Sequence, residues 1–103
     1  MKADYPHSFS AEEALQRIQA LTDYWSNRYG VKIGWSGSTA NVEGKVKGVS
    51  FKGTVRVDET SITADIKVNF LAEKLGGKSY VDRKIKSYLD SGVPVDELDR
   101  GTS

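Results

Sequence analysis

Residues 48–70 constrain the fold more than any other stretch of this chain, because apolar and polar side chains alternate there at every second position. Side chains on a β-strand alternate between two faces, so this period predicts two antiparallel strands separated by a short polar segment. One face is then buried and the other meets water. The inward positions are Val49, Phe51, Gly53, Val55, Val57, Ile62, Ala64, Ile66, Val68 and Phe70.

Two further strands precede this stretch, since residues 31–35 and 40–46 alternate in the same way. Residues 47–48 form a two-residue hairpin turn, in which the glycine supplies the positive φ that such turns need. A four-residue loop at 58–61 keeps the inward phase of the last strand, and a two-residue turn at 58–59 would keep it as well. The turn at 47–48 sets a register that pairs Val46 with Val49, Gly44 with Phe51 and Val42 with Gly53.

Two amphipathic helices flank the strands. The sequence S-A-E-E from Ser10 is a capping box, the apolar residues of 11–29 follow three- and four-residue spacing, and Gly30 suits the helix end. Ser79 begins a second helix, which ends at Gly92. We therefore predict an α+β fold in the order α-β-β-β-β-α, a four-stranded antiparallel meander with both helices on one face. The domain spans residues 10–91, between an N-terminal arm at 1–9 and a flexible C-terminal tail at 92–103.

Composition narrows the functional classes. With 15 basic and 14 acidic residues the net charge is +1, so no overall field attracts nucleic acid. The chain contains no cysteine, which excludes disulfides and thiolate chemistry. We see no signal-peptide pattern and no apolar run near the ~20 residues of a transmembrane segment. A cytoplasmic protein is expected.

One motif resembles a nucleotide-binding loop. Residues 72–79 read A-E-K-L-G-G-K-S, the loose phosphate-binding pattern with alanine in place of its first glycine. That chemistry requires a parallel sheet and an acidic strand end that organises magnesium. The predicted antiparallel strands finish before the motif, so we interpret it as a turn followed by the helix cap at Ser79.

No catalytic or metal-binding group is apparent from the pattern. His7 is the single histidine and lies on the predicted arm without an oriented acidic partner. The carboxylates fall at a helix start, on the open sheet face and in the tail, so none forms a buried pair suited to acid–base catalysis. We expect no cofactor, no metal and no enzymatic activity.

Two candidate binding surfaces follow from the strand pattern. Inward aromatic rings could line a pocket for an apolar acyl ligand, although packing in the core is their commoner role. The residues of this pocket are Trp35, Phe51 and Phe70. Outward basic side chains could bind a polyanion, but Glu43 and Asp65 dilute them and the face lacks the aromatics that stack RNA bases. The residues of this basic face are Lys45, Lys52, Arg56 and Lys67.

Residues 6–90 resemble the polyhydroxyalkanoic acid system proteins. The similarity rests on P-H-S near the start, E-E-A-L-Q-R-I at the first helix, Y-G-V at its end and a tryptophan closing the first strand. G-V-S-F-K-G-T-V-R-V matches a glycine-punctuated third strand, and F-L before a terminal helix with K-S-Y-L-D completes the pattern. The tail after Asp90 and the pair Gly76-Gly77 have no counterpart in it.

The resemblance implies an association with polyhydroxyalkanoate, a bacterial storage polyester, and with its granules, and it carries no catalytic motif. It implies an accessory or interaction protein. Granule coating requires an exposed apolar patch, for which Tyr5, Phe9, Tyr24 and Tyr80 are candidates; we take Tyr5, Phe9 and Tyr80 as the granule contact. The expected partners are granules or granule-associated proteins. A homodimer could form through the open edge of the first or fourth predicted strand.

Overall fold

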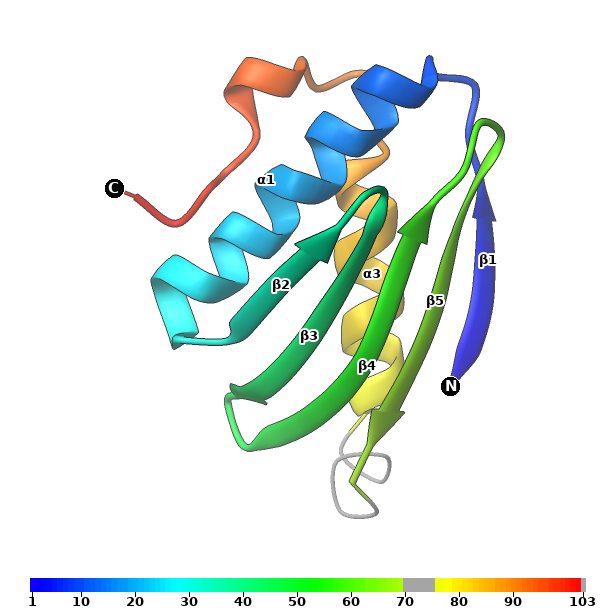
Figure 1. Ribbon diagram of the computed structural model, residues 1–103. Coiled ribbons are helices and arrows are strands. Elements are labelled where there is room, and N and C mark those ends of the chain that lie inside the picture. Colours follow the sequence, from blue (N-terminus) through cyan, green and yellow to red (C-terminus); the bar gives the residue numbers. More distant parts are fainter. Residues whose placement is uncertain (70–75, 103) are drawn as a thin grey trace.

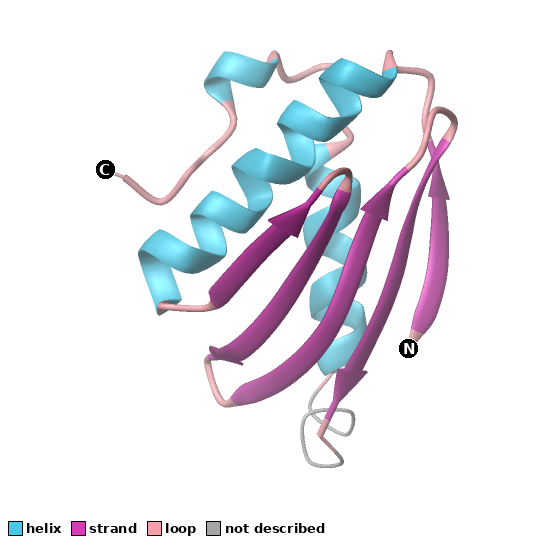
Figure 2. Ribbon diagram, viewed as in Figure 1, coloured by secondary structure: helices cyan, strands magenta, loops and turns pink. Residues whose placement is uncertain are grey.

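The structure is a computed structural model that describes residues 1–69 and 76–102. Its elements follow the chain in the order β1 (Lys2–Pro6), α1 (Ala11–Tyr29), β2 (Lys32–Ser36), β3 (Thr39–Val46), β4 (Val49–Val57), β5 (Ser61–Val68), α3 (Gly77–Tyr88) and the short 3₁₀ helix η1 (Val95–Glu97). Within this part of the chain, α1 and α3 lie behind the sheet in Figure 1, and the other sheet face is open. Figure 2 shows the same two layers by element type. The α+β class and the placement of both helices on one face are confirmed.

The sheet contains five strands rather than the four predicted, in the order β1-β5-β4-β3-β2, with every neighbouring pair antiparallel. The additional strand is β1, in the segment expected to be an arm. Tyr5 pairs with Ile62, and Pro6 ends the strand. A proline is tolerated there because β1 is an edge strand. β1 therefore covers β5, the last strand of the predicted meander, and the open edges of the sheet are β1 and β2.

The predicted hairpin register is confirmed, since Val46 pairs with Val49, Gly44 with Phe51 and Val42 with Gly53. The turn has φ of 49° at Lys47 and 84° at Gly48, as a two-residue hairpin requires. Gly53 has a separate reason to be glycine. A Cβ at Gly53 would lie 2.1 Å from the Asp65 carbonyl oxygen and 2.6 Å from the Ile66 Cα, so only glycine lets β5 approach this closely.

The helices close the apolar face. The Ser10 hydroxyl accepts a hydrogen bond from the Glu13 amide at 3.0 Å, and Gly30 ends α1 with φ of 69°, as predicted. The boundaries of α3 differ from the prediction: it begins at Gly77, after Gly76 with φ of 85°, and its helical residues end at Tyr88. The shared core includes the fully buried side chains of Ile18, Leu21, Trp25, Val55, Ile66 and Ile85.

The segment after α3, predicted to be a flexible tail, lies against α1. Arg17 is only 2% exposed, and its guanidinium donates to the carbonyl oxygens of Tyr88 and Asp90, each at 3.1 Å, and of Val93 at 2.7 Å. Farther along the segment, Arg100 pairs with Asp23 on α1 at 2.7 Å. These contacts fasten the end of the chain to α1.

Candidate functional site

The open face of the sheet carries polar side chains from all five strands. Strand pairing places outward side chains in rows that cross the sheet. One row runs Lys32, Glu43, Lys52 and Lys67, and the next runs Gly34, Asn41, Thr54, Asp65 and Lys2. Most of these side chains carry hydrogen-bond donors. The face therefore offers donors in a regular array that no helix covers.

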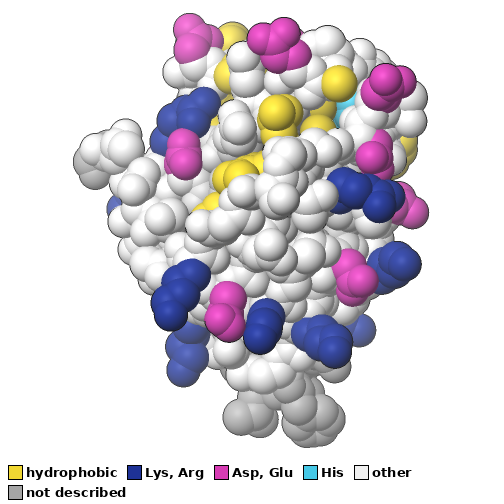
Figure 3. All heavy atoms as spheres, in the orientation of Figure 1, with side chains coloured by type: hydrophobic (Ala, Val, Ile, Leu, Met, Phe, Trp, Pro, Cys, Tyr) yellow, Lys and Arg dark blue, Asp and Glu magenta, His cyan; other side chains and the backbone are white. Residues whose placement is uncertain are grey.

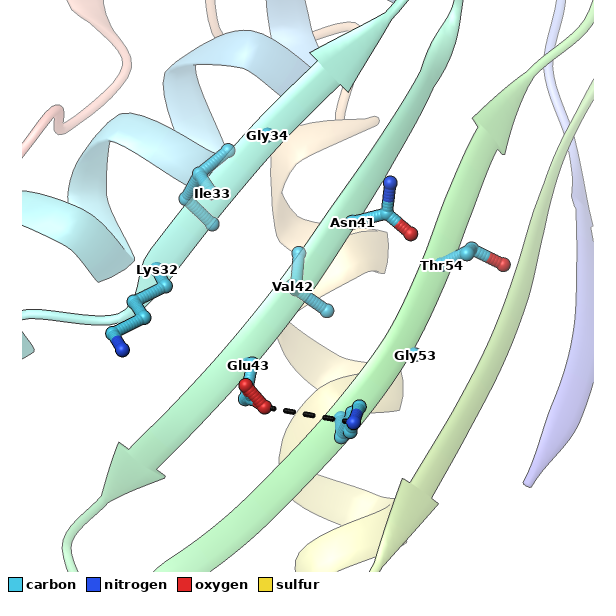
Figure 4. A pocket seen from close by; sticks show the side chains of 9 residues that line it. Lys32, Ile33, Gly34, Asn41, Val42, Glu43, Gly53 and Thr54 are labelled. Atoms are coloured by element: carbon cyan, nitrogen blue, oxygen red, sulfur yellow. Dashed lines mark ion pairs between the residues drawn. The ribbon is translucent and has the colours of Figure 1, made fainter.

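A hollow of about 500 Å³ lies between these two rows, on strands β2, β3 and β4. Its lining residues are Lys32, Ile33, Gly34, Asn41, Val42, Glu43, Lys52, Gly53 and Thr54. In Figure 4 the side chains of Asn41, Thr54 and Lys32 stand around it, and the glycines leave its base free of side chains. Glu43 and Lys52 form an ion pair at 3.7 Å that is exposed to solvent, so it adds little to stability.

The predicted basic face divides between two ends of the sheet. Lys45, Lys52 and Lys67 are exposed on the open face near the β3–β4 turn. Arg56 lies at the other end of β4 and pairs with Asp58 at 3.0 Å. Lysine and arginine side chains line the lower part of the face in Figure 3, and hydrophobic side chains appear only higher up. The basic region is therefore a cluster of lysines, joined by Lys32 of the hollow.

Trp35 and Phe51, two of the three residues of the predicted apolar pocket, lie apart on the inner face of the sheet. Phe51 is buried against Trp25, with ring centroids 5.3 Å apart. Trp35 is half-buried, and its indole nitrogen donates to the Thr22 hydroxyl at 3.3 Å. Trp35 pairs with Ala40, which in turn pairs with Val55, so Val55 is the residue of β4 level with Trp35. Val55 and Phe51 are four residues apart, which is about 13 Å along a strand. Phe70 lies outside the described residues.

The three residues predicted to contact granules lie on different elements. Tyr5 is buried on β1. Phe9 is half-buried, and the Arg17 guanidinium lies 4.2 Å from its ring centroid. Tyr80 is half-buried on α3, where its hydroxyl accepts a hydrogen bond from the Trp25 indole at 3.1 Å. These residues do not form one exposed patch.

His7 and the described end of the phosphate-loop-like motif make contacts within the fold. His7 Nε2 donates to the Asp58 carbonyl oxygen at 2.9 Å, and the ring stacks on Phe9 with centroids 6.0 Å apart. Only the last residues of the phosphate-loop-like motif are described, and Gly77 to Ser79 form the first turn of α3. Among residues 1–69 and 76–102, no group of three or more histidine or acidic side chains could hold a metal ion. In the same residues, neither helix is long and apolar enough to cross a membrane.

Sequence reasoning missed two features of the sites. Lys32, Asn41 and Thr54 occupy outward positions of the strand pattern, so alternation could have indicated the hollow once strand order was known. The sequence did not indicate the buried role of Arg17, because the groups that accept its hydrogen bonds are mostly backbone carbonyls of a distant segment.

The fold and the open face define a small α+β domain whose uncovered antiparallel sheet offers a polar, donor-rich surface. The sequence model of the family described as "Putative polyhydroxyalkanoic acid system protein" matches residues 2–92. The chain belongs to this family, and the predicted resemblance is confirmed. The same comparisons found no curated protein and no solved structure similar to the chain.

Proposed function

We propose that this chain is a non-catalytic accessory protein of the polyhydroxyalkanoic acid system and that it binds storage granules by hydrogen bonds from the open face of its sheet, in place of the apolar patch expected from the sequence. Family membership over residues 2–92 is the observation that carries the proposal. A cytoplasmic location, as expected from the sequence, belongs to the same proposal.

The chemistry of the polymer supports the choice of surface. A polyhydroxyalkanoate chain presents ester oxygens, which accept hydrogen bonds and cannot donate them. The face supplies donors from Lys32, Asn41, Lys52 and Thr54 around one hollow. Donors on the protein and acceptors on the polymer are complementary, and the regular strand spacing repeats them across the surface.

The test uses the tagged protein in cells of its source, imaged with and without polyester accumulation, together with sedimentation of the purified chain with native granules. We expect recruitment to granules, and weaker co-sedimentation for the double variant Lys52→Ala with Lys67→Ala, which removes two hydrogen-bond donors from the open face. The matched control is Arg28→Ala with Arg83→Ala, which removes the exposed charges and donors of two side chains on the helices. Diffuse fluorescence in both states, with no co-sedimentation, would reject the proposal.

A polyanion is the second candidate ligand, favoured by the gathering of Lys45, Lys52 and Lys67 at one end of the face. The dependence of binding on salt concentration distinguishes a polyanion from the neutral polyester as the ligand. Affinity for a polyanion falls steeply as salt rises, because binding releases counterions, whereas hydrogen bonds to neutral esters depend weakly on salt. We therefore expect co-sedimentation with granules to change little between low and moderate salt.

A further inference from the structure

A second hollow, of about 350 Å³, lies between β1 and α3. Its lining residues are Ala3, Asp4, Tyr5, Pro6, Asp82, Lys86 and Leu89, and none of them lines the hollow on the open face. Asp82 and Lys86 are one helical turn apart on α3 and form an ion pair at 3.1 Å. We call this hollow the β1–α3 cleft.

The phenol of Tyr5 has no hydrogen-bond partner in the cleft. Tyr5 is 4% exposed, and its hydroxyl oxygen is buried without a partner. Burial, and then the nearby carboxylate of Asp82, raises the pKa of Tyr5 to about 12, although no hydrogen bond of ordinary geometry joins the two groups. Buried polar groups are nearly always paired, so an unpartnered hydroxyl at a cleft calls for an explanation. It remains a protonated donor at neutral pH.

We propose that the β1–α3 cleft binds the free hydroxyl end of a polyhydroxyalkanoate chain. The terminal hydroxyl accepts a hydrogen bond from Tyr5 and donates one to the Asp82 carboxylate. The adjacent ester carbonyl accepts from the Lys86 ammonium. Ala3, Pro6 and Leu89 supply apolar contacts for the short alkyl group. This inference rests on the proposed function for its choice of ligand.

The charges of the cleft favour a chain end over a free hydroxy acid. The Asp82 carboxylate lines the cleft beside the Lys86 ammonium, whereas the Asp4 carboxylate accepts a hydrogen bond from the Thr63 hydroxyl at 2.8 Å on the open face of the sheet. A free hydroxy acid would bring a second carboxylate next to Asp82, whose partner Lys86 already balances one negative charge, and would meet repulsion. An ester of the same hydroxyacyl unit is neutral, and it retains both the hydroxyl and the carbonyl that the cleft recognises.

The binding test is an NMR titration of the full chain with four probes. The two ligands are methyl 3-hydroxybutyrate and the methyl ester of its linear trimer with a free hydroxyl end. The comparison compounds are methyl butyrate, which lacks the hydroxyl, and the sodium salt of 3-hydroxybutyrate. We expect both hydroxyl-bearing esters to shift amide signals of β1 and α3, and methyl butyrate and the salt to bind at least threefold more weakly.

Two variants test the assigned contacts. Tyr5→Phe removes only the hydroxyl and should lower affinity for the esters about three- to tenfold, the effect of one hydrogen bond. Asp82→Asn removes the carboxylate that faces the cleft, so the preference for ester over free acid should shrink. Asp65→Asn, on the open sheet face, is the matched control and should leave binding unchanged. Because the lost hydroxyl has no partner, Tyr5→Phe should fold with wild-type stability in urea.

Equal affinity for methyl butyrate and methyl 3-hydroxybutyrate would overturn the assignment, as would unchanged binding by Tyr5→Phe. Absence of any shift in β1 and α3 would also overturn it. The result is separable from the proposed function. Granule recruitment without ester binding in the cleft rejects this inference alone, whereas ester binding without recruitment rejects the granule role and leaves a hydroxyacyl site.

Discussion

Replacing Arg17 by methionine should destabilise the fold more than any other single change to a charged side chain of α1. The guanidinium is buried and donates to the carbonyl oxygens of Tyr88, Asp90 and Val93 and to the Glu13 carboxylate. Methionine keeps most of the apolar stem, so the variant removes the donors and creates little empty space. The carbonyls that lose their donor are then left between α1 and the chain end.

The magnitude follows from burial. Hydrogen bonds from a charged donor contribute about 1.5–3 kcal/mol each when buried. The bond to Tyr88 is buried, and those to Asp90 and Val93 are partly accessible, so water replaces part of their loss. We discount the Glu13 pair because that carboxylate is 40% exposed. The expected loss is about 3 kcal/mol, which for a domain of this size lowers Tm by roughly 12–24 °C.

Urea denaturation followed by circular dichroism measures the loss, and hydrogen exchange locates it. We expect amides of 93–101 to lose protection first while those of β3 and β4 keep theirs. Arg28→Met is the control, since Arg28 is exposed in the last turn of the same helix, and it should cost about 0.5 kcal/mol or less. A loss below about 1 kcal/mol for Arg17→Met would refute the anchoring role argued from these contacts.

Three further predictions concern the sheet, the phenols and the chain end. Gly53→Ala should destabilise by about 3 kcal/mol or more, because the added Cβ would overlap the β5 backbone. Gly34→Ala, with nothing within 4 Å of its added Cβ, should change stability by about 0.5 kcal/mol or less; equal effects in urea titrations would disprove the close approach. Burial, and then the Asp82 carboxylate, raises the pKa of Tyr5 to about 12 in the folded chain, above the 10.0 of an exposed tyrosine. Unfolded chains therefore ionise first, and stability should fall as the pH rises between these two values; urea midpoints that are flat there, or that fall equally in Tyr5→Phe, would contradict this. Removing residues 93–103 should destabilise the wild-type chain more than it destabilises the Arg17→Met variant, because both changes remove the contact between Arg17 and this segment. Additive losses of stability in a double-mutant cycle would show that the two changes act independently.

Local patterns predicted much of the fold. The alternation of 48–70 and the turn at 47–48 specified strand phase and register, because both depend on neighbouring residues alone. The strand β1 was missed for the opposite reason. Its Ala3 and Tyr5 alternate with polar residues, but the run is short and ends in proline, and its partner lies about sixty residues away. No residue near β1 in the sequence indicates that it pairs with β5.

The candidate sites were predicted less well. Four outward basic side chains were identified from alternation. The three lysines lie together, whereas Arg56 pairs with Asp58 at the other end of β4. Tyr5 was expected on the surface, yet pairing of β1 turns its ring inward. Arg17 and the β1–α3 cleft depend on contacts between distant elements. Such contacts involve backbone carbonyls or single side chains, and residue types alone do not reveal them.

The pairing of β1 with β5 also determines the order in which the chain can fold. Residues 2–6 cannot join the sheet until 61–65 are available, so a loop of more than fifty residues must close before the first strand gains its hydrogen bonds. The β3–β4 hairpin closes across two residues and has no such delay. Loop closure over long separations slows folding. The chain should therefore fold from its middle outward, with its first residues added to the sheet last.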